Sequence, residues 1–411
     1  MERTILHCDM NNFYASVECM LDPGLKDKVV AVAGSAESRH GIVLAKNYKA
    51  KAVGISTGDA IWQARQKFNK VVIVEPHYEQ YIKFSKLARE IYSRFTNQIE
   101  PYGMDECFLD VTGSQKAFGT AMQIAHRIRR TIKFELGLTI SVGVSFNKIF
   151  AKLGSDLKKP DAVTCIDSDT FRERIWGLPA SDLLGVGRAT TRVLNRYGIS
   201  TIGDLANAPL DLIKSRLGKN GLLLVAYANG ADCSPVHRTD YEYPVKSIGH
   251  GITTIQDLET DSEVWAVMID LVQDIGTKLR KYKKKAFGVS IAIRNNELFY
   301  QEWQCKLDLP TQSPSNLVKA AFELFQKSYS WEFPIRTVTL RAINLIEEKQ
   351  EVQYGLFVDY EQSQKRERLD AAIEEIRYKF GKEAIKNAVL LYPSLLPESR
   401  AQITMPTGVF R

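Results

Sequence analysis

The sequence predicts an α+β protein with several domains, and three observations lead to this prediction. A chain of 411 residues exceeds the usual size of one domain and suggests about three. Over residues 1–165, short apolar runs alternate with segments of helical periodicity. The same alternation returns from residue 246, after a stretch of short helices broken by Gly and Pro. Strands that alternate with helices indicate mixed sheets covered by helices.

The N-terminal alternation is expected to form one mixed sheet with helices on one face. Strands are expected at TILHCD (4–9), KVVAVAG (28–34), GIVLAKN (41–47), ECFLDV (106–111) and LTISVGVSF (138–146). Helices are expected at NNFYASVECML (11–21), GDAIWQARQKF (58–68), YIKFSKLAREIYSRF (81–95) and GTAMQIAHRIRRTIKFEL (119–136).

Residues 166–231 are expected to form short helices around a glycine turn, LLGVGRATTRVL, at 183–194. Gly185 and Gly187 allow a tight turn and a close backbone approach. Exposed amide groups at the start of the next helix favour a phosphate. The segment resembles a helix-hairpin-helix element, which grips a DNA backbone without reading its sequence. A plain helix–helix connection is the alternative.

The C-terminal half begins with a polar, Pro-containing linker at 232–245. Residues 246–347 follow the order β-α-β-β-α-β, which is typical of a ferredoxin-like domain. The stretch KLRKYKKK (278–285) has six basic residues in eight, so Lys283, Lys284 and Lys285, together with Lys246, are candidates for contacts with DNA phosphates. A solvated charged face is the alternative. Residues 348–411 are expected to form a tail.

The composition is that of an ordinary soluble protein, with 45% hydrophobic and 25% charged residues. The net charge of +7 is compatible with a nucleic-acid partner. No apolar run approaches the ~20 residues of a membrane span. The six cysteines form no CxxC pair, which indicates reduced thiols. We therefore expect a monomeric cytoplasmic protein without a membrane partner.

Three carboxylates are candidates for a metal site. Asp9 ends the first strand, and Asp105 and Glu106 stand side by side within the apolar stretch PYGMDECFLDV. A buried carboxylate is costly unless it is paired, hydrogen-bonded or bound to a metal. Three acids without a matching basic cluster indicate a divalent cation, and hard oxygen ligands favour Mg²⁺. Two such ions stabilise the attacking and the leaving oxygen of a phosphoryl transfer.

A triphosphate would need cations on the side away from the metals. Tyr48 and Lys51 are three residues apart and therefore share a helix face. Lys148 and Lys152 have i, i+4 spacing. Each lysine alone would be a surface residue, and only their joint presence favours a nucleotide site.

These motifs together resemble the Y-family DNA polymerases of the bacterial DinB type, over residues 3–347. The matching segments are DMNNFYASVE (9–18), NYKAKAVGISTG (47–58), MDECFLDVTGS (104–114), SVGVSFNKIFAKLGSDLKKP (141–160), LLGVGRATTRVL (183–194) and KSIGHGITT (246–254). Six motifs in order make the resemblance specific.

The resemblance implies a right-hand polymerase. Its palm would take residues 1–19 and 78–165, its small fingers 20–77, its helix-hairpin-helix thumb 166–231 and its ferredoxin-like little finger 246–347. It also implies that Asp9, Asp105, Glu106 and the Met10 carbonyl are metal ligands. Tyr48, Lys51 and Lys152 match triphosphate contacts. Phe13 and Tyr14 match the aromatic pair under the incoming nucleotide, and Tyr14 falls on the steric-gate position.

Two departures from the family pattern concern the active site. Ala45 stands where threonine is usual, and Lys46 where a small residue is usual. The hydroxyl contact to the triphosphate is therefore absent, and Lys46 is a candidate substitute. GMDECF (103–108) replaces the commoner SIDEAY, but both carboxylates are retained.

The resemblance predicts template-directed DNA synthesis on primer-template DNA with deoxynucleoside triphosphates. A small fingers domain closes only a loose pocket, so we expect low fidelity, low processivity and translesion synthesis. A two-metal nuclease and an inactive DNA-binding relative are the alternatives. Tyr14, Tyr48, Lys51 and Lys152 disfavour a nuclease, and the intact acids disfavour an inactive protein.

The pentapeptide QYGLF (353–357) resembles the sliding-clamp-binding motif of bacteria. In that motif a Gln and a terminal Leu-Phe pair, here Gln353, Leu356 and Phe357, anchor in a pocket of the clamp. Tyr354 stands where Leu is more usual. The alternative is that Leu356 and Phe357 pack back onto the preceding domain.

Overall fold

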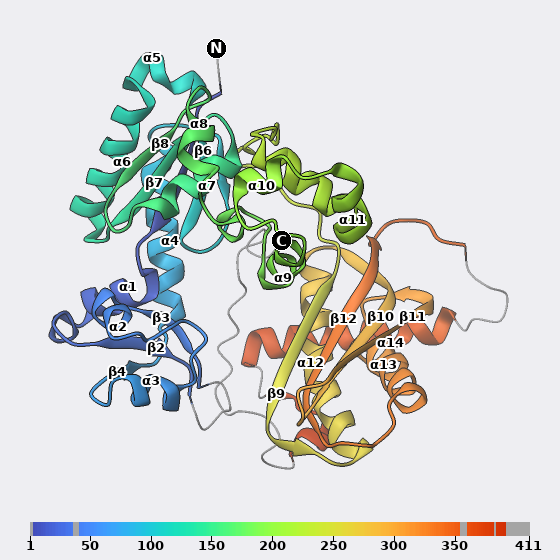
Figure 1. The fold of residues 1–411 in the computed structure, drawn as a ribbon. Coiled ribbons are helices and arrows are strands. Elements are labelled where there is room, and N and C mark those ends of the chain that lie inside the picture. Colours follow the sequence, from blue (N-terminus) through green and yellow to red (C-terminus); the bar gives the residue numbers. More distant parts are fainter. Residues whose placement is uncertain (1–2, 36–40, 354–359, 382–383, 392–411) are drawn as a thin grey trace. The chain divides into compact units, whose positions relative to one another are not determined.

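The computed structural model describes residues 3–35, 41–353, 360–381 and 384–391, and the chain divides into two compact units after Tyr243 (Figure 1). Both units combine sheets with helices, as the sequence predicts. None of the helices described in these ranges combines the length and the apolar character that spanning a bilayer requires.

A five-stranded sheet with the order β5-β6-β1-β7-β8 forms the centre of the first unit. Its strands are β1 (Ile5–Met10), β5 (Ile99–Pro101), β6 (Glu106–Asp110), β7 (Ile140–Ser145) and β8 (Val163–Ile166). Strand β1 is fully buried and pairs antiparallel with both β6 and β7. The strands β5 and β8 at the two edges were not expected from the sequence.

Helices cover both faces of this sheet, so the expectation of a single covered face is wrong. The helices of this part are α1 (Phe13–Leu21), α4 (Tyr78–Ser93), α5 (Gln115–Phe118), α6 (Ala121–Leu136) and α7 (Lys148–Leu157), with short 3-10 turns at η1 (Pro23–Leu25) and η2 (Thr112–Ser114). Side chains of β1 alternate between the faces. Leu6, Cys8 and Met10 share a core with α4 and α6. Ile5 shares a core with Ala151 of α7. Asp9 therefore lies on the α7 face.

Gly143 lets α7 lie directly against β7. A Cβ atom at this glycine would lie 1.9 Å from the Ala151 carbonyl oxygen and 2.5 Å from the Ser155 backbone nitrogen. Backbone atoms cannot move aside without shifting the whole helix. The contact fixes the distance between α7 and the sheet, and therefore the position of Lys152.

We expect Gly143→Ala to destabilise the protein by about 1–3 kcal/mol or more, because the added methyl group overpacks this contact. Gly113→Ala is the matched control, since a Cβ atom there would meet nothing within 4 Å. Chemical denaturation of both variants measures the effect. Equal stabilities would show that α7 can shift without cost.

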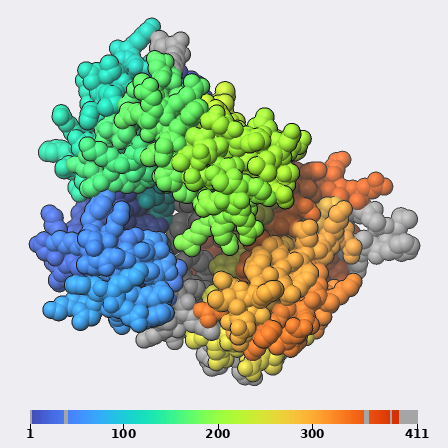
Figure 2. All heavy atoms as spheres, viewed as in Figure 1, coloured from blue at the N-terminus to red at the C-terminus, as the bar shows by residue number. Residues whose placement is uncertain are grey.

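A smaller three-stranded sheet, β3-β2-β4, lies between α1 and α4 in the sequence. It comprises β2 (Val30–Ala33), β3 (Val43–Lys46) and β4 (Val72–Val74), with α2 (Tyr48–Ala52) and α3 (Ile61–Lys67). Its core is small and built from short side chains such as Ala31, Ala50 and Ala64. In the space-filling view the segment from β2 to β4 belongs to the blue body (Figure 2). Strand β4 was not expected, whereas α2 agrees with the helix face assigned to Tyr48 and Lys51.

Short helices complete the first unit. They are α8 (Phe171–Ile175), η3 (Ala180–Asp182), α9 (Arg188–Arg196), α10 (Ile202–Ala206) and α11 (Leu210–Ala228). Gly218 has non-helical dihedral angles and divides α11 into two helical pieces. Ile202, Leu205, Leu224 and Val225 belong to the core that joins these helices.

The second unit has the predicted order β-α-β-β-α-β. Its elements are β9 (Ile248–Leu258), α12 (Asp261–Lys281), β10 (Lys284–Asn295), β11 (Tyr300–Thr311), α13 (Pro314–Ser328) and β12 (Ile335–Glu347). The sheet is antiparallel throughout, with the order β11-β10-β12-β9. Buried residues of α12 and α13 pack with Ile291 and Leu340 of the sheet in one core.

Two further elements follow this sheet, α14 (Tyr360–Phe380) and η5 (Ala388–Leu391). Helix α14 contacts α13 and β11, although the sequence treated these residues as a tail. Its attachment is mainly polar, which explains why hydrophobic periodicity did not reveal it.

Candidate active site

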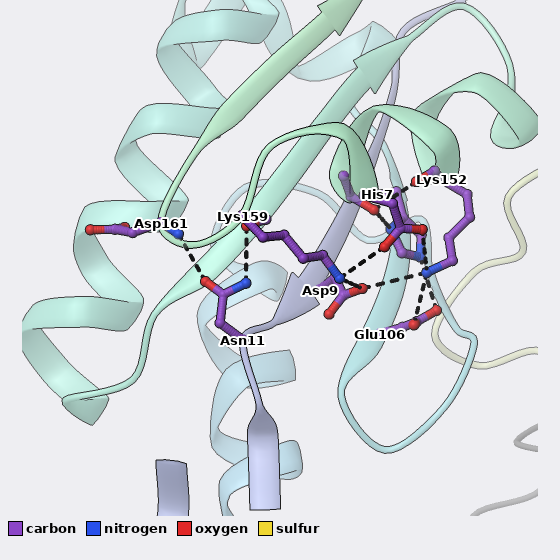
Figure 3. Close-up of polar contacts among 10 residues, drawn as sticks. His7, Asp9, Asn11, Glu106, Lys152, Lys159 and Asp161 are labelled. Carbon is purple, nitrogen blue, oxygen red and sulfur yellow. Dashed lines mark hydrogen bonds and ion pairs between the residues drawn. The ribbon is translucent and has the colours of Figure 1, made fainter. Parts of the chain in front are cut away.

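The three predicted acids meet at one end of the five-stranded sheet, where the charges of Asp9 and Glu106 act on Asp105. Figure 3 shows Asp9 and Glu106 there. Asp9 of β1 and Glu106 of β6 are opposite one another in the strand register. Asp105 directly precedes β6, and its carbonyl oxygen accepts a hydrogen bond of 3.1 Å from the Met10 N–H. Strand pairing therefore brings together acids that are about 95 positions apart in the chain.

Two lysines lie between these carboxylates. The Lys152 Nζ atom is 2.9 Å from Glu106 Oε1 and 3.4 Å from Asp9 Oδ2. The Lys159 Nζ atom is 2.7 Å from Asp9 Oδ2. Asp156 contacts both ammonium groups, at 3.2 and 2.8 Å. The expectation that the acids lack a basic cluster is therefore wrong, because α7 and the turn after it carry two cations to the site.

Lys148 does not join this cluster, although it shares a helix face with Lys152. Its Nζ atom is 2.7 Å from Glu100 Oε2 and 3.1 Å from the Pro235 carbonyl oxygen. Both side chains of the Lys148–Glu100 pair are buried. This lysine holds the structure together and is not available to a triphosphate.

His7 is a site residue that the sequence did not single out. Its Nδ1 atom is 2.8 Å from the Ser155 hydroxyl, and its Nε2 atom is 3.3 Å from Glu106 Oε2. Burial lowers the pKa of His7. Its position two residues before Asp9 puts it on the same strand face. That spacing could have revealed it.

Burial and mutual repulsion raise the pKa values of two acids. Burial, followed by the charge of Glu106, raises the pKa of Asp9. Burial and the charges of Asp9 and Glu106 raise the pKa of Asp105 to about 7. Burial alone would also raise the pKa of Glu106, but His7 and Lys152 lower it to about 2. The site thus concentrates negative charge that needs cations.

The chemistry of this donor set fits a divalent cation. In the described part of the chain, no three His, Cys, Asp or Glu side chains stand in a complete ligand arrangement. Asp9, Asp105 and Glu106 nonetheless offer hard oxygen ligands at one place. The ammonium groups of Lys152 and Lys159 now supply the positive charge that a metal would bring.

Tyr14 lies beside the acids and is held by another ring. It stacks on Tyr81 with 4.1 Å between ring centroids and 9° between planes. Burial and the nearby charge of Asp105 raise the pKa of Tyr14 to about 12. Phe13 is buried in the core, whereas Tyr14 is only half-buried. Of this pair, Tyr14 has the more accessible ring.

Residues of β3 and α2 add further positive charge. Burial raises the pKa of Tyr48, and the charges of Lys159 and Asp9 also act on it. Tyr48 is therefore near the acid cluster. Lys46 contacts the Thr57 hydroxyl at 3.2 Å. Burial and then the charge of Lys51 lower the pKa of Lys46, so these two lysines are neighbours.

The candidate DNA contacts of the first unit surround the start of α9. Gly185 has a φ of +92°, a conformation that L side chains rarely adopt. Gly187 is the N-cap of α9, and no side chain caps it. Among the described residues, the N-cap position therefore offers no side-chain acceptor to the first amide groups of the helix.

The candidates of the second unit differ in their surroundings. Lys246 and Lys283 are exposed. Lys284 forms an ion pair with Glu347, and the Lys285 Nζ atom is 3.6 Å from Glu367 Oε2. The clamp-motif residues Leu356 and Phe357 lie outside the described residues, whereas Gln353 is exposed.

We expect neutralisation of Lys283, Lys284 and Lys285 to weaken primer-template binding equally for all sequences. Each lost phosphate contact should lower the slope of log K against log salt by about one unit. Binding titrations at several salt concentrations measure this slope. An unchanged slope would identify the stretch as a solvated face.

Two family models and several relatives match this chain. The impB/mucB/samB family model matches residues 8–156, and the model of the family's C-terminal domain matches residues 245–356. DNA polymerase IV of Acetivibrio thermocellus is 46% identical over 391 residues, which cover 95% of this chain and 98% of the relative. DNA polymerase IV 2 of Bacillus subtilis is 35% identical over 402 residues, which cover 95% of this chain and 95% of the relative.

A solved structure with the same fold is a Y-family DNA polymerase chimera. It matches with a TM-score of 0.75 and 22% identity, over 84% of this chain and 99% of the chimera. At this identity the match shows the fold, and it confirms the predicted right-hand polymerase architecture.

Proposed function

We propose a residue-level mechanism for this chain, which belongs to the impB/mucB/samB family and is a Y-family DNA polymerase of the DNA polymerase IV type. The enzyme performs template-directed translesion synthesis. The observation that carries the mechanism is the meeting of Asp9, Asp105 and Glu106 at one end of the sheet, with two ammonium groups between them.

In this mechanism the three carboxylates and the Met10 carbonyl would hold two Mg²⁺ ions. The family's reaction uses divalent metals, which stabilise the attacking and leaving oxygens of the phosphoryl transfer. His7 positions Glu106 through its Nε2 atom, 3.3 Å away.

The lysines act on the triphosphate. A cation at the carboxylates would repel Lys152 and Lys159 from their present partners, because like charges cannot share the site. Both ammonium groups are on flexible stems and can turn to the phosphate oxygens. Tyr48 and Lys51 match further contacts, and Lys46 takes the place of the hydroxyl that is absent at Ala45.

The domains divide the work. In the proposed assignment the palm (1–19 and 78–165) carries the chemistry and the fingers (20–77) cover the nascent base pair. The thumb (166–231) and the little finger (246–347) hold the DNA backbone. The fingers have a small core of short side chains, which supports a loose pocket and low fidelity.

Primer extension with and without Mg²⁺ tests the proposal. We expect the primer to lengthen only with the metal and in the order that the template dictates. Shortening of the primer would indicate a two-metal nuclease, and an unchanged primer would indicate an inactive DNA-binding protein. A panel of lesion-bearing templates would then identify the lesions that the enzyme passes.

We also propose that QYGLF (353–357) docks a sliding clamp. Leu356→Ala with Phe357→Ala should leave single-nucleotide insertion intact and remove stimulation by a loaded clamp. Tethering makes rebinding intramolecular, and truncation of such apolar anchors typically costs at least ~2 kcal/mol. Insertion and clamp-dependent synthesis are measured side by side.

The matched control replaces another Leu-Phe pair, Leu298 and Phe299, by alanine. These side chains are also exposed, at 52% and 70%. Clamp-dependent synthesis should survive in the control. If it also survives the loss of Leu356 and Phe357, another segment makes the contact.

A further inference from the structure

Helix α14 is attached to the second unit by its polar face. No residue of α14 is buried. The side chains at Ser363, Arg366, Glu367, Asp370 and Glu374 recur at three- and four-residue intervals and make the contacts with α12, α13 and residues 311–315. Two large apolar residues of the helix, Leu369 and Phe380, are instead 60% and 74% exposed. This arrangement is the reverse of an ordinary surface helix.

Three carboxylates of α14 contact the second unit, and the first of them, Glu367, meets three polar groups. Its Oε1 atom accepts hydrogen bonds from the Thr311 hydroxyl at 3.1 Å and the Gln312 N–H at 3.3 Å. Its Oε2 atom is 3.6 Å from the Lys285 ammonium group. A hydroxyl, a backbone amide and a lysine thus converge on one anion.

The other two carboxylates meet similar groups. Asp370 accepts hydrogen bonds from the Ser313 hydroxyl and, at 3.5 Å, from the Ser315 hydroxyl. Both serines lie at the start of α13, a helix of 15 residues, where the helix dipole also favours an anion. Glu374 pairs with the Arg280 guanidinium.

These donors form one surface, which we call the oxyanion surface and define as Arg280, Lys285, Thr311, Gln312, Ser313 and Ser315. Lys285 forms an ion pair with a carboxylate of α14, and each of the other members donates a hydrogen bond to one. Lysine, arginine, hydroxyl groups and backbone amides are also the groups that contact phosphates in protein–DNA complexes. Two members, Arg280 and Lys285, belong to the basic stretch 278–285.

The polar contacts that attach α14 to the oxyanion surface can be broken reversibly. The helix contributes no buried apolar side chain, so little hydrophobic free energy resists its departure. Ion pairs near the surface stabilise little and weaken with salt. A polyanion with a higher charge density can therefore displace the carboxylates.

We propose that the oxyanion surface binds the phosphate backbone of DNA, and that α14 is an internal competitor whose carboxylates occupy it when DNA is absent. DNA can then bind here only after α14 has left the surface. The apparent association constant for DNA is therefore the intrinsic constant multiplied by the fraction of molecules in which the surface is free. The proposal rests on the function above only in taking primer-template DNA as the ligand.

The test compares two variants of the full-length protein with the same change in charge. Glu367→Gln with Glu374→Gln removes two carboxylates from the oxyanion surface. Glu361→Gln with Glu375→Gln removes two from elsewhere on α14, where Glu361 is exposed and Glu375 pairs only with Lys379 among the described residues. Primer-template binding is measured by fluorescence anisotropy at several salt concentrations.

We expect the first variant to bind DNA about 3–10-fold more tightly than the control at low salt. Its salt slope should be steeper by up to about two units, because up to two further phosphate contacts become available. Adding Arg280→Gln and Lys285→Gln should abolish the gain. Equal affinities and slopes for variant and control would overturn the proposal.

A crosslink provides an independent measurement, in case the substitutions disturb folding. Asn316 and Ser363 are in contact, with 3.3 Å between Nδ2 and Oγ. Cysteines at both positions, joined by a short bis-maleimide, would hold α14 in place. The crosslinked protein should bind DNA more weakly than the same protein before crosslinking, whereas the parent treated with the reagent should not change. Unaltered affinity after crosslinking would contradict the proposal.

Both measurements record binding and need no nucleotide addition. If the acid site proved not to be catalytic, these tests would still decide whether α14 competes with DNA. Conversely, if the polymerase is active and its α14 variants bind DNA like the control, only the proposal about α14 is wrong.

Discussion

Replacement of Asp105 or Glu106 by Ala is expected to reduce nucleotide addition by about 10³-fold, since metal-held charge stabilisation supplies several kcal/mol of the barrier. DNA binding should change little, because the proposed DNA contacts are other side chains, such as the exposed Lys246 and Lys283. Single-turnover primer extension and anisotropy measure the two effects separately. The structure adds a reason for the sensitivity of Glu106, which contacts both Lys152 and His7.

Two further variants make this result specific. Glu106→Gln keeps the size of the side chain and should lose activity like Glu106→Ala. If Glu106 served only to fill space, Glu106→Gln would instead retain most of the activity. Asp110→Asn is the control on the same strand, where the Oδ1 atom accepts a hydrogen bond of 2.9 Å from the Thr112 N–H that Asn can also accept. Near-normal extension by Glu106→Ala would rule out its assignment as a metal ligand.

Tyr14→Ala is expected to raise ribonucleotide insertion relative to deoxynucleotide insertion by about 10²-fold. A ring against C2′ of the sugar leaves no room for a 2′-hydroxyl, so the protein rejects the wrong substrate by a clash. The stack on Tyr81, with 9° between the planes, holds the ring rigidly enough for this purpose. Insertion kinetics with paired ribo- and deoxynucleotides give the ratio.

Tyr14→Phe separates the ring from its hydroxyl group. Discrimination should persist in this variant, because the ring and its stacking on Tyr81 remain. If the ratio does not rise in Tyr14→Ala, the side chain is a packing residue and another group excludes the ribose hydroxyl.

The sequence by itself determined the order of the elements and the chemistry of the acids. Alternation of polar and apolar residues is set by neighbours two to four positions apart, so it can be read from one chain. It predicted β1, β6 and β7, and the β-α-β-β-α-β order of the second unit. The DMNNFYASVE and MDECFLDVTGS motifs identified the family and its three carboxylates. The short strands β4, β5 and β8 carry too few residues for a period to appear.

Only the tertiary structure decided which charges meet. Lys148 and Lys152 are equivalent in spacing, yet one is buried against Glu100 and the other lies between Asp9 and Glu106. The register of β1 and β6 and the close approach of α7 at Gly143 set that difference. In the same way, the basic stretch gave no sign that Lys285 and Arg280 meet carboxylates of α14. Ion pairs between distant segments have no period in the sequence, because their geometry arises only when the packed elements bring the charges together.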